Sequence, residues 1–123
     1  MTDEFVGAAS LELDGREVEV QSISVTTVTG KRLVKTMNRK RRAKGFSRGI
    51  TTYDINLTAV IPVNGPPIDW DNIESAKITI APVGTSGRTS YRDAFTIQAG
   101  KKYQLEGEAV IDVNMGALDK VEE

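Results

Sequence analysis

Residues 51–61 read TTYDINLTAVI, and this stretch decides the class of fold. Apolar side chains recur at every second position, at Tyr53, Ile55, Leu57, Ala59 and Ile61. Polar side chains, mostly Thr, Asp and Asn, fill the positions between them. Because successive side chains of a strand point to opposite faces, this alternation predicts a β-strand with one buried side and one polar side.

A β-hairpin is predicted on the N-terminal side of this strand. Residues 11–20 alternate apolar and acidic side chains on both sides of Asp14-Gly15, a dipeptide favoured in two-residue hairpin turns. The apolar phase then shifts by one position before Ile23. Since one extra residue moves every later side chain to the other face, we expect a β-bulge near Ser22.

More strands are expected on the C-terminal side. Residues 64–67 (NGPP) predict a loop, and Asp69 is expected to cap a short helix that runs through Asn72 to Ser75 and buries Trp70 and Ile73 on one side. Strands follow over 77–81, 88–98 and 108–118, and in the second of these we place Tyr91, Phe95 and Ile97 on one face. The connections are too short for repeated crossover helices, so pairing should be antiparallel.

The expected fold is therefore mainly β. We predict an antiparallel β-sandwich or small β-barrel with one short flanking helix and one long loop, in a single domain spanning residues 1–123. At this length the chain can build one hydrophobic core.

Composition excludes most catalytic and metal chemistry. The chain contains no Cys and no His, so disulfides, thiolate ligands, imidazole ligands and the usual proton shuttle are absent. Asp69, Asp71 and Glu74 fit the acidic start of a helix better than a metal site. We expect no enzyme activity, no catalytic or metal site and no cofactor. No apolar run approaches a membrane span and the first residues are acidic, so we expect neither a membrane segment nor a signal peptide, and residence in the cytosol.

Charge is strongly segregated along the chain. Residues 30–50 contain nine of the sixteen basic residues and no acid, although the net charge of the chain is −1. The alternation is also lost here, so we expect a long basic loop that is mobile when the subunit is free. Its candidate interaction residues are Lys31, Arg32, Lys35, Arg39, Lys40, Arg41, Arg42, Lys44, Phe46 and Arg48.

Three readings of this loop remain open. Clustered cations could neutralise nucleic-acid phosphates, although Phe46 alone gives little support for base stacking. The loop could instead dock on an acidic face of a sister subunit, because complementary charges fix the register of an interface. It could also be an ordinary solvated loop.

The order of elements resembles the tail tube proteins of contractile-tailed, Mu-like bacteriophages. The resemblance is carried by residues 13–18 (LDGREV), 46–57 (FSRGITTYDINL) and 92–97 (RDAFTI), and it extends over nearly the whole chain. The loop of this chain departs from the family in being so basic.

The resemblance implies a structural virion protein of the phage tail, assembled in the host cytoplasm. Its subunits would form hexameric rings that stack through the long loop into a tube, a conduit for DNA. Implied partners are further copies of the chain and the sheath, tape-measure, baseplate and tail-terminator proteins, and DNA would pass without specific binding. A baseplate or injection-machine tube component is the related alternative, and a small nucleic-acid-binding module using residues 31–48 is the competing one.

A channel for DNA should not hold phosphates. We therefore expect the basic loop to lie between rings or outside the tube, and the channel wall to carry acids and small polar groups. The candidate lumen-facing residues are Glu106, Glu108, Asp112 and Asn114.

Overall fold

The structure is a computed structural model that describes residues 2–63 and 68–122. The loop expected at 64–67 lies outside the described residues. These form ten strands and one short 3₁₀ turn: β1 (Ala9–Leu13), β2 (Arg16–Val18), β3 (Val20–Val28), β4 (Arg32–Val34), β5 (Gly45–Ser47), β6 (Thr52–Val60), η1 (Trp70–Asn72), β7 (Ala76–Pro82), β8 (Thr89–Lys102), β9 (Val110–Ala117) and β10 (Asp119–Glu122).

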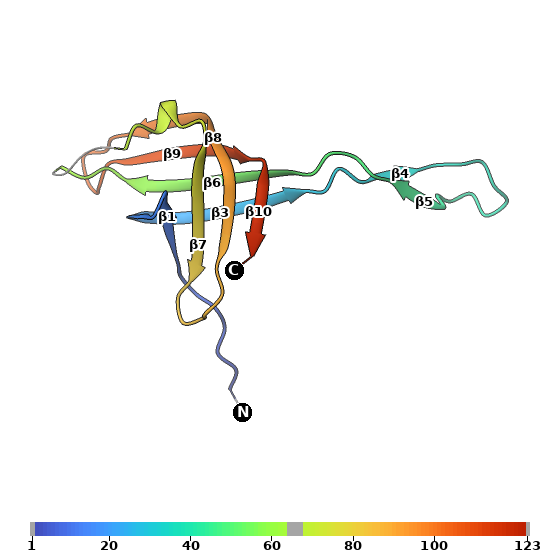
Figure 1. The fold of residues 1–123 in the computed structure, drawn as a ribbon, viewed down its shortest axis with the longest axis horizontal. Helices are drawn as coiled ribbons and strands as arrows, with labels where there is room; N and C mark the ends of the chain where they lie inside the picture. Colours follow the sequence, from blue (N-terminus) through green and yellow to red (C-terminus); the bar gives the residue numbers. More distant parts are fainter. Residues whose placement is uncertain (1, 64–67, 123) are drawn as a thin grey trace.

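The strands form two layers, and all neighbours are antiparallel, as predicted. The main path runs β2-β1-β7-β8-β9-β6-β3, with β10 also paired to β8. The long β8 belongs to both layers, because its first half pairs with β7 and β10 and its second half with β9. Figure 1 shows β3, β6 and β9 running across the direction of β7 and β10. We call the two layers the β3 sheet (β3, β6, β9 and the second half of β8) and the β7 sheet.

The core fills the space between the two layers. Leu11, Ile55, Ile78 and Met115 are fully buried, and they come from β1, β6, β7 and β9. Ile55, Leu57 and Ala59 are buried as the alternation of residues 51–61 predicts. Within the described residues the first and last strands of the path, β2 and β3, do not pair with each other. The fold is therefore an open sandwich and not a closed barrel.

The N-terminal hairpin and its bulge are confirmed. Asp14 and Gly15 connect β1 and β2 with φ values of 52° and 84°, and two positive φ angles are what a type I′ hairpin turn requires. The pairing of β3 with β6 shifts register between Val20 and Ser22, where the change of apolar phase placed the bulge.

The common phase expected for β8 is wrong. The register with β7 shifts near Asp93, which has a φ of 53°, so Tyr91 and Ala94 both face the core. Phe95 pairs with Gly116 on the outer side, where a Cβ built on that glycine would lie 3.0 Å from the Phe95 ring. Ile97 lies beside it and is 57% exposed. One inserted residue has therefore moved Phe95 and Ile97 away from the core.

The short helix expected after Asp69 is present only as one turn, and its expected cap is wrong. A single 3₁₀ turn covers Trp70–Asn72, and the Asp69 side chain makes no capping bond to the backbone. Its carboxylate accepts instead from the side-chain amide of Asn72, at 2.7 Å. Trp70 is nevertheless buried and Ile73 packs against the core, as expected.

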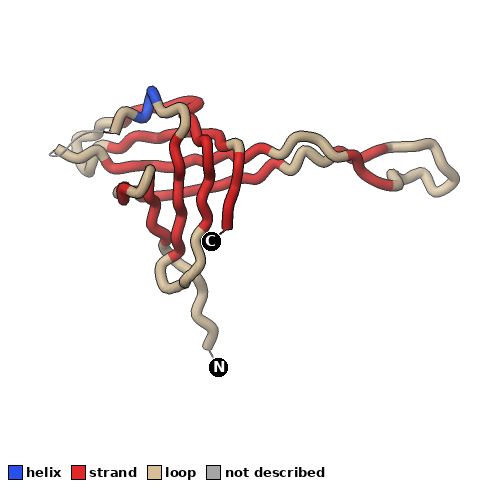
Figure 2. The backbone as a smooth tube through the Cα atoms, in the orientation of Figure 1, coloured by secondary structure: helices blue, strands red, loops and turns tan. Residues whose placement is uncertain are grey.

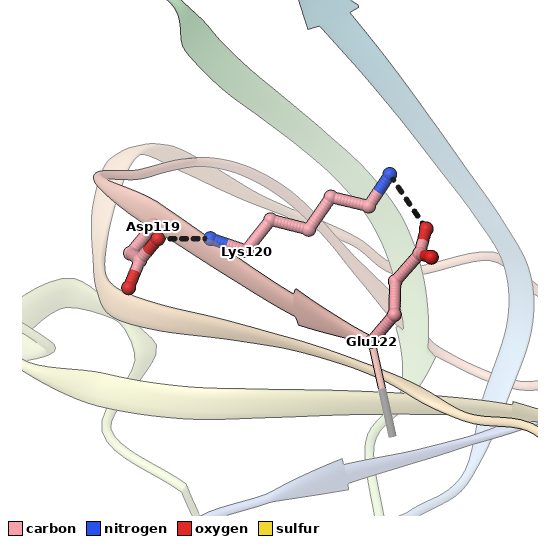
Figure 3. Close-up of polar contacts among 3 residues, drawn as sticks. All are labelled: Asp119, Lys120 and Glu122. Atoms are coloured by element: carbon pink, nitrogen blue, oxygen red, sulfur yellow. Dashed lines mark hydrogen bonds and ion pairs between the residues drawn. The ribbon is translucent and has the colours of Figure 1, made fainter.

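The last strand, β10, was not foreseen from the sequence. It pairs with the first half of β8 and continues the chain after β9. Figure 3 shows Asp119 accepting a hydrogen bond from the Lys120 backbone amide at 2.8 Å, and Lys120 Nζ lying 3.4 Å from Glu122 Oε1. This exposed ion pair adds little stability, so backbone pairing is what holds the strand.

Candidate assembly surfaces

Residues 30–50 form an arm that projects far from the sandwich, and we call them the basic arm. Figures 1 and 2 show it continuing the line of β3 and β6 away from both layers. The predicted long basic loop contains a short ladder, because β4 and β5 pair within it, with Arg32 opposite Ser47 and Leu33 opposite Phe46. The arm is therefore a two-stranded hairpin without a layer to pack on.

The neck of the arm is a close approach of two glycines. Gly30 has a φ of +78°, and a Cβ built on it would lie 2.7 Å from the Ile50 amide nitrogen, so a larger residue would displace the backbone. Gly49 faces Gly30 equally closely. Next to them, the Thr51 hydroxyl donates to the Thr29 carbonyl at 3.1 Å. These contacts direct the arm away from the sandwich.

In the middle of the arm, two cationic side chains lie over an apolar one. Lys31 Nζ and the Arg48 guanidinium lie 5.5 and 5.6 Å from the centre of the Phe46 ring, within cation–π range. Phe46 is still 55% exposed and Leu33, its cross-strand partner, is 68% exposed. Such a pair is what an interface would cover.

Asn38 organises the tip of the arm. Its side-chain amide donates to the Arg42 carbonyl at 2.8 Å, and its Oδ1 accepts from the Lys40 amide at 3.0 Å. The Asn38 carbonyl accepts from the Arg41 amide, and Arg41 has a φ of 56°. This turn presents the four consecutive cations at 39–42, and no charge pattern pointed to Asn38.

We expect Asn38→Ala to loosen this tip. Four hydrogen bonds of the side chain, to Thr36, Lys40 and Arg42, would be lost, while no core contact would change. The basic tip should then be cut by trypsin several-fold faster, measured on the free protein by gel densitometry. Asn72→Ala, which removes an amide outside the arm, is the matched control. Equal cleavage of wild type and Asn38→Ala would show that Asn38 does not hold the turn.

The outer side of the β3 sheet is a second candidate surface, which we call the polar face. Ser24, Asn56, Asn114 and Gln98 lie in one row across its four strands, as the pairing registers show. In the next row the Thr58 hydroxyl donates to Asp112 Oδ1 at 2.7 Å. The polar face comprises Ser22, Ser24, Thr26, Asp54, Asn56, Thr58, Gln98, Asp112 and Asn114. Phe95 and Ile97 lie at its β8 edge, next to Gly116.

The candidate lumen residues divide into two groups. Asp112 and Asn114 lie on the polar face, and Asn114 Oδ1 is buried without a hydrogen-bond partner in the described part of the chain. Glu108 lies beyond the sheet, where it accepts from the side-chain amide of Gln21. Glu106 is exposed in the loop between β8 and β9. The register also brings Asp54, Asn56 and Thr58 to this face, and their alternation with Tyr53 and Ile55 was the signal for it.

All nine cations of the basic arm are exposed, and none is among the residues of the polar face. The arm and the polar face are thus separate surfaces of opposite character. Among residues 2–63 and 68–122, no cluster of three or more acidic side chains could hold a metal ion. Within the same ranges, no helix is long and apolar enough to cross a membrane.

The fold is thus two antiparallel layers with a hairpin that prolongs two strands of one layer. The chain is similar, with a TM-score of 0.75 and 14% identity, to a chain of the sheath/tube terminator of the PVC extracellular contractile injection system, covering 100% of this chain and 98% of that one. It is also similar to the SPP1 tail tube protein, with a TM-score of 0.67, 10% identity and coverage of 93% and 76%. A tail protein of the GTA particle gives a TM-score of 0.67, 12% identity and coverage of 94% and 92%.

The chain therefore has the fold of phage tail tube and contractile injection system tube and terminator proteins. No protein-family model matches the sequence, and no curated protein matches it. At 10–14% identity this likeness shows the fold alone.

Proposed function

We propose that this protein is a structural, non-catalytic subunit of a phage-type tail tube, acting as a single tail-tube-like domain over residues 1–123. The observation that carries the proposal is the pair of open edges on the β3 sheet. Among the described residues, β3 pairs with β6 alone, and the side of β8 away from β9 has no strand partner from Ile97 to Lys102. Open edges invite pairing with another chain.

Pairing of β3 of one subunit with the second half of β8 of the next would continue the β3 sheet from subunit to subunit. The contact uses two different edges, so it is heterologous and closes into a ring when its rotation permits. Ile23 and Val25 on β3 face the core and remain half-buried, and a neighbouring sheet would cover them further. Six copies per ring is the proposed number, since the GTA tail to which this fold is similar has C6 symmetry.

In such a ring the polar face would line the channel. It carries Asp54 and Asp112 among small polar side chains, and Lys102 lies one row further on, opposite Val110. Because the acids outnumber this cation, the face would not retain phosphates. Asp112 and Asn114 are the proposed wall residues, with Glu106 and Glu108 near the mouth. The channel would conduct DNA during delivery into the host cell.

The basic arm would join one ring to the next and lie outside the channel. The proposed location is the virion tail, assembled in the host cytoplasm, with sheath, tape-measure, baseplate and terminator proteins as partners. The arm's candidate contact residues are its nine cations and Phe46. A tube-terminating cap is a second candidate, favoured by the TM-score of 0.75 over the whole chain with the PVC terminator structure.

The test is negative-stain electron microscopy of the purified protein at high concentration, together with its mass in solution. Hollow rings stacked into tubes are expected for a tube subunit, and rings that stop at one or two layers for a cap. A protein that stays monomeric and retards DNA on a gel would contradict both and establish the basic arm as a nucleic-acid-binding element.

A further inference from the structure

A pocket of about 330 Å³ opens at one end of the sandwich, and we call it the end pocket. Its walls come from β2, the end of β6 and the segment around η1. Val18, Ile61, Ile68 and Trp70 give it an apolar lining, and Glu17, Glu19, Arg16 and Lys101 lie around it. The proposed tube function uses the open edges, the polar face and the arm, and it leaves this pocket without a role.

The end pocket and the basic arm lie at opposite ends of the same strands. β6 begins next to the arm at Thr52 and ends at Val60, which lines the pocket. β3 runs the other way, from the pocket end at Val20 to the arm end at Val28. Nine residues at about 3.3 Å each separate the two ends by roughly 30 Å. The sandwich of Figure 1 lies between them, so the arm does not reach the pocket of its own copy.

The two ends carry opposite charge. The arm has nine cations and no acid between residues 30 and 50. The pocket lining itself holds two acids, Glu17 and Glu19, and two cations, Arg16 and Lys101. Four further exposed acids are close in sequence to lining residues: Asp69 and Asp71 flank Trp70, and Glu106 and Glu108 lie with Lys102 between Lys101 and Ile111. This end of the sandwich therefore carries six of these acids and three cations. Complementary charge at opposite ends of one molecule orients copies head to tail and raises their rate of encounter.

The apolar groups also match. Met37 is fully exposed at the base of the arm's tip. An unbranched thioether adapts to irregular apolar spaces, and the lining of the end pocket is such a space. The cations at 39–42 follow Met37 after one residue, Asn38, and would then lie over the acids at this end of the sandwich.

We propose that the end pocket receives the basic arm of a second copy, with Met37 entering beside Trp70. This inference rests on the proposed tube function and names the receiving surface for ring stacking. A head-to-tail contact of this kind does not close on two copies, so it propagates layer by layer. Rings would carry arms on one end and pockets on the other, which gives the stack a polarity.

The test uses two complementary variants. The arm variant carries Arg39→Glu, Lys40→Glu and Arg42→Glu and keeps its pocket. The pocket variant carries Glu17→Lys and Glu19→Lys, with Trp70→Phe added, and keeps its arm. Trp70 is the one tryptophan of the chain, so fluorescence of the mixture reports on the intact pocket of the arm variant. Asp3→Lys with Glu4→Lys makes the same charge change away from the pocket.

Sedimentation and microscopy should show no stacking of rings for either variant alone. In the mixture, a ring of one variant should bind a ring of the other, stacking should stop at two layers, and the fluorescence emission of Trp70 should shift. The Asp3/Glu4 control should stack like wild type. Met37→Ser, at a fully exposed position, should weaken association about tenfold, since it removes the buried contact but no charge. Circular dichroism melts confirm that each variant is folded.

Stacking of the pocket variant as in wild type, or unchanged Trp70 emission in the mixture, would overturn the proposal. Tubes from both wild type and the pocket variant would leave the tube function standing and remove the end pocket from it. If the mixture associates but wild type forms neither rings nor tubes, the contact between arm and end pocket stands and the tube function falls. Arm and pocket would then join copies in some other assembly.

Discussion

Replacing residues 29–51 by Asn-Gly is expected to give rings that do not stack into tubes. Val28 and Thr52 are opposite each other at the end of the β3–β6 ladder, so a two-residue turn can join them. The replaced segment contains no buried core residue, and a shorter loop costs less closure entropy. The sandwich should therefore melt within a few degrees of wild type, while the surface proposed to join rings is gone.

The measurement is electron microscopy with sedimentation of both proteins at equal concentration. Deletion changes the net charge from −1 to −10, because nine cations and no acids are lost, and this alone raises repulsion between rings. A control with the nine Lys and Arg changed to Gln keeps the hairpin while removing the same charge. If the deletion variant forms tubes as long as wild type, the arm does not join the rings.

The control also separates two contributions to stacking. With charges removed but Leu33, Met37 and Phe46 retained, some association should persist if apolar contacts matter. High salt should weaken stacking of the wild-type rings as the Gln control does, because it screens exposed charges and leaves apolar burial in place. Rings held by sheet pairing should outlast the contacts between rings as salt rises.

Most of the fold could be predicted from the alternation of apolar and polar side chains along the sequence. The apolar positions of residues 51–61 and the acidic alternation around Asp14-Gly15 each placed a strand and its buried side correctly. The shift of phase before Ile23 placed the bulge. These signals are local, and each reflects the alternation of side chains along a half-buried strand.

The errors arose where one residue with a positive φ or a distant partner decides the structure. No feature of the sequence indicated a β-bulge at Asp93 in β8. This bulge places Phe95 and Ile97 on the outer side of the sheet. β10 has few apolar residues and exists because β8 offers it an edge. The hairpin of the basic arm likewise depends on a short ladder with little burial.

The candidate surfaces were only partly predictable for the same reason. Segregation of charge identified the arm, and the polar side of residues 51–61 was visible. Which polar residues of β3, β6, β8 and β9 share a row depends on registers set by two bulges. The end pocket joins β2, β6 and η1, which are distant in sequence, so its combination of Trp70 with Glu17 and Glu19 emerged only from the fold.

Ile55→Ala should cause the largest loss of stability of any single substitution considered. Ile55 is fully buried at the centre of β6, opposite Met115 on one side and Val25 on the other. Truncation removes apolar burial and leaves a cavity in a strand clamped on both sides, so we expect a loss of about 2–5 kcal/mol in the free energy of unfolding. This corresponds to a melting temperature lower by roughly 10 °C or more.

Thermal denaturation followed by circular dichroism measures this effect. Ile50→Ala is the matched control, because Ile50 is 83% exposed in the basic arm and its truncation should change stability by less than about 0.5 kcal/mol. Equal melting temperatures for the two variants would mean that the Ile55 side chain does not lie in the core between the two layers. β6 also carries Asp54, Asn56 and Thr58 on its other side, so unfolding of β6 removes the polar face together with the core. Above its melting temperature, the Ile55→Ala variant should therefore form no rings.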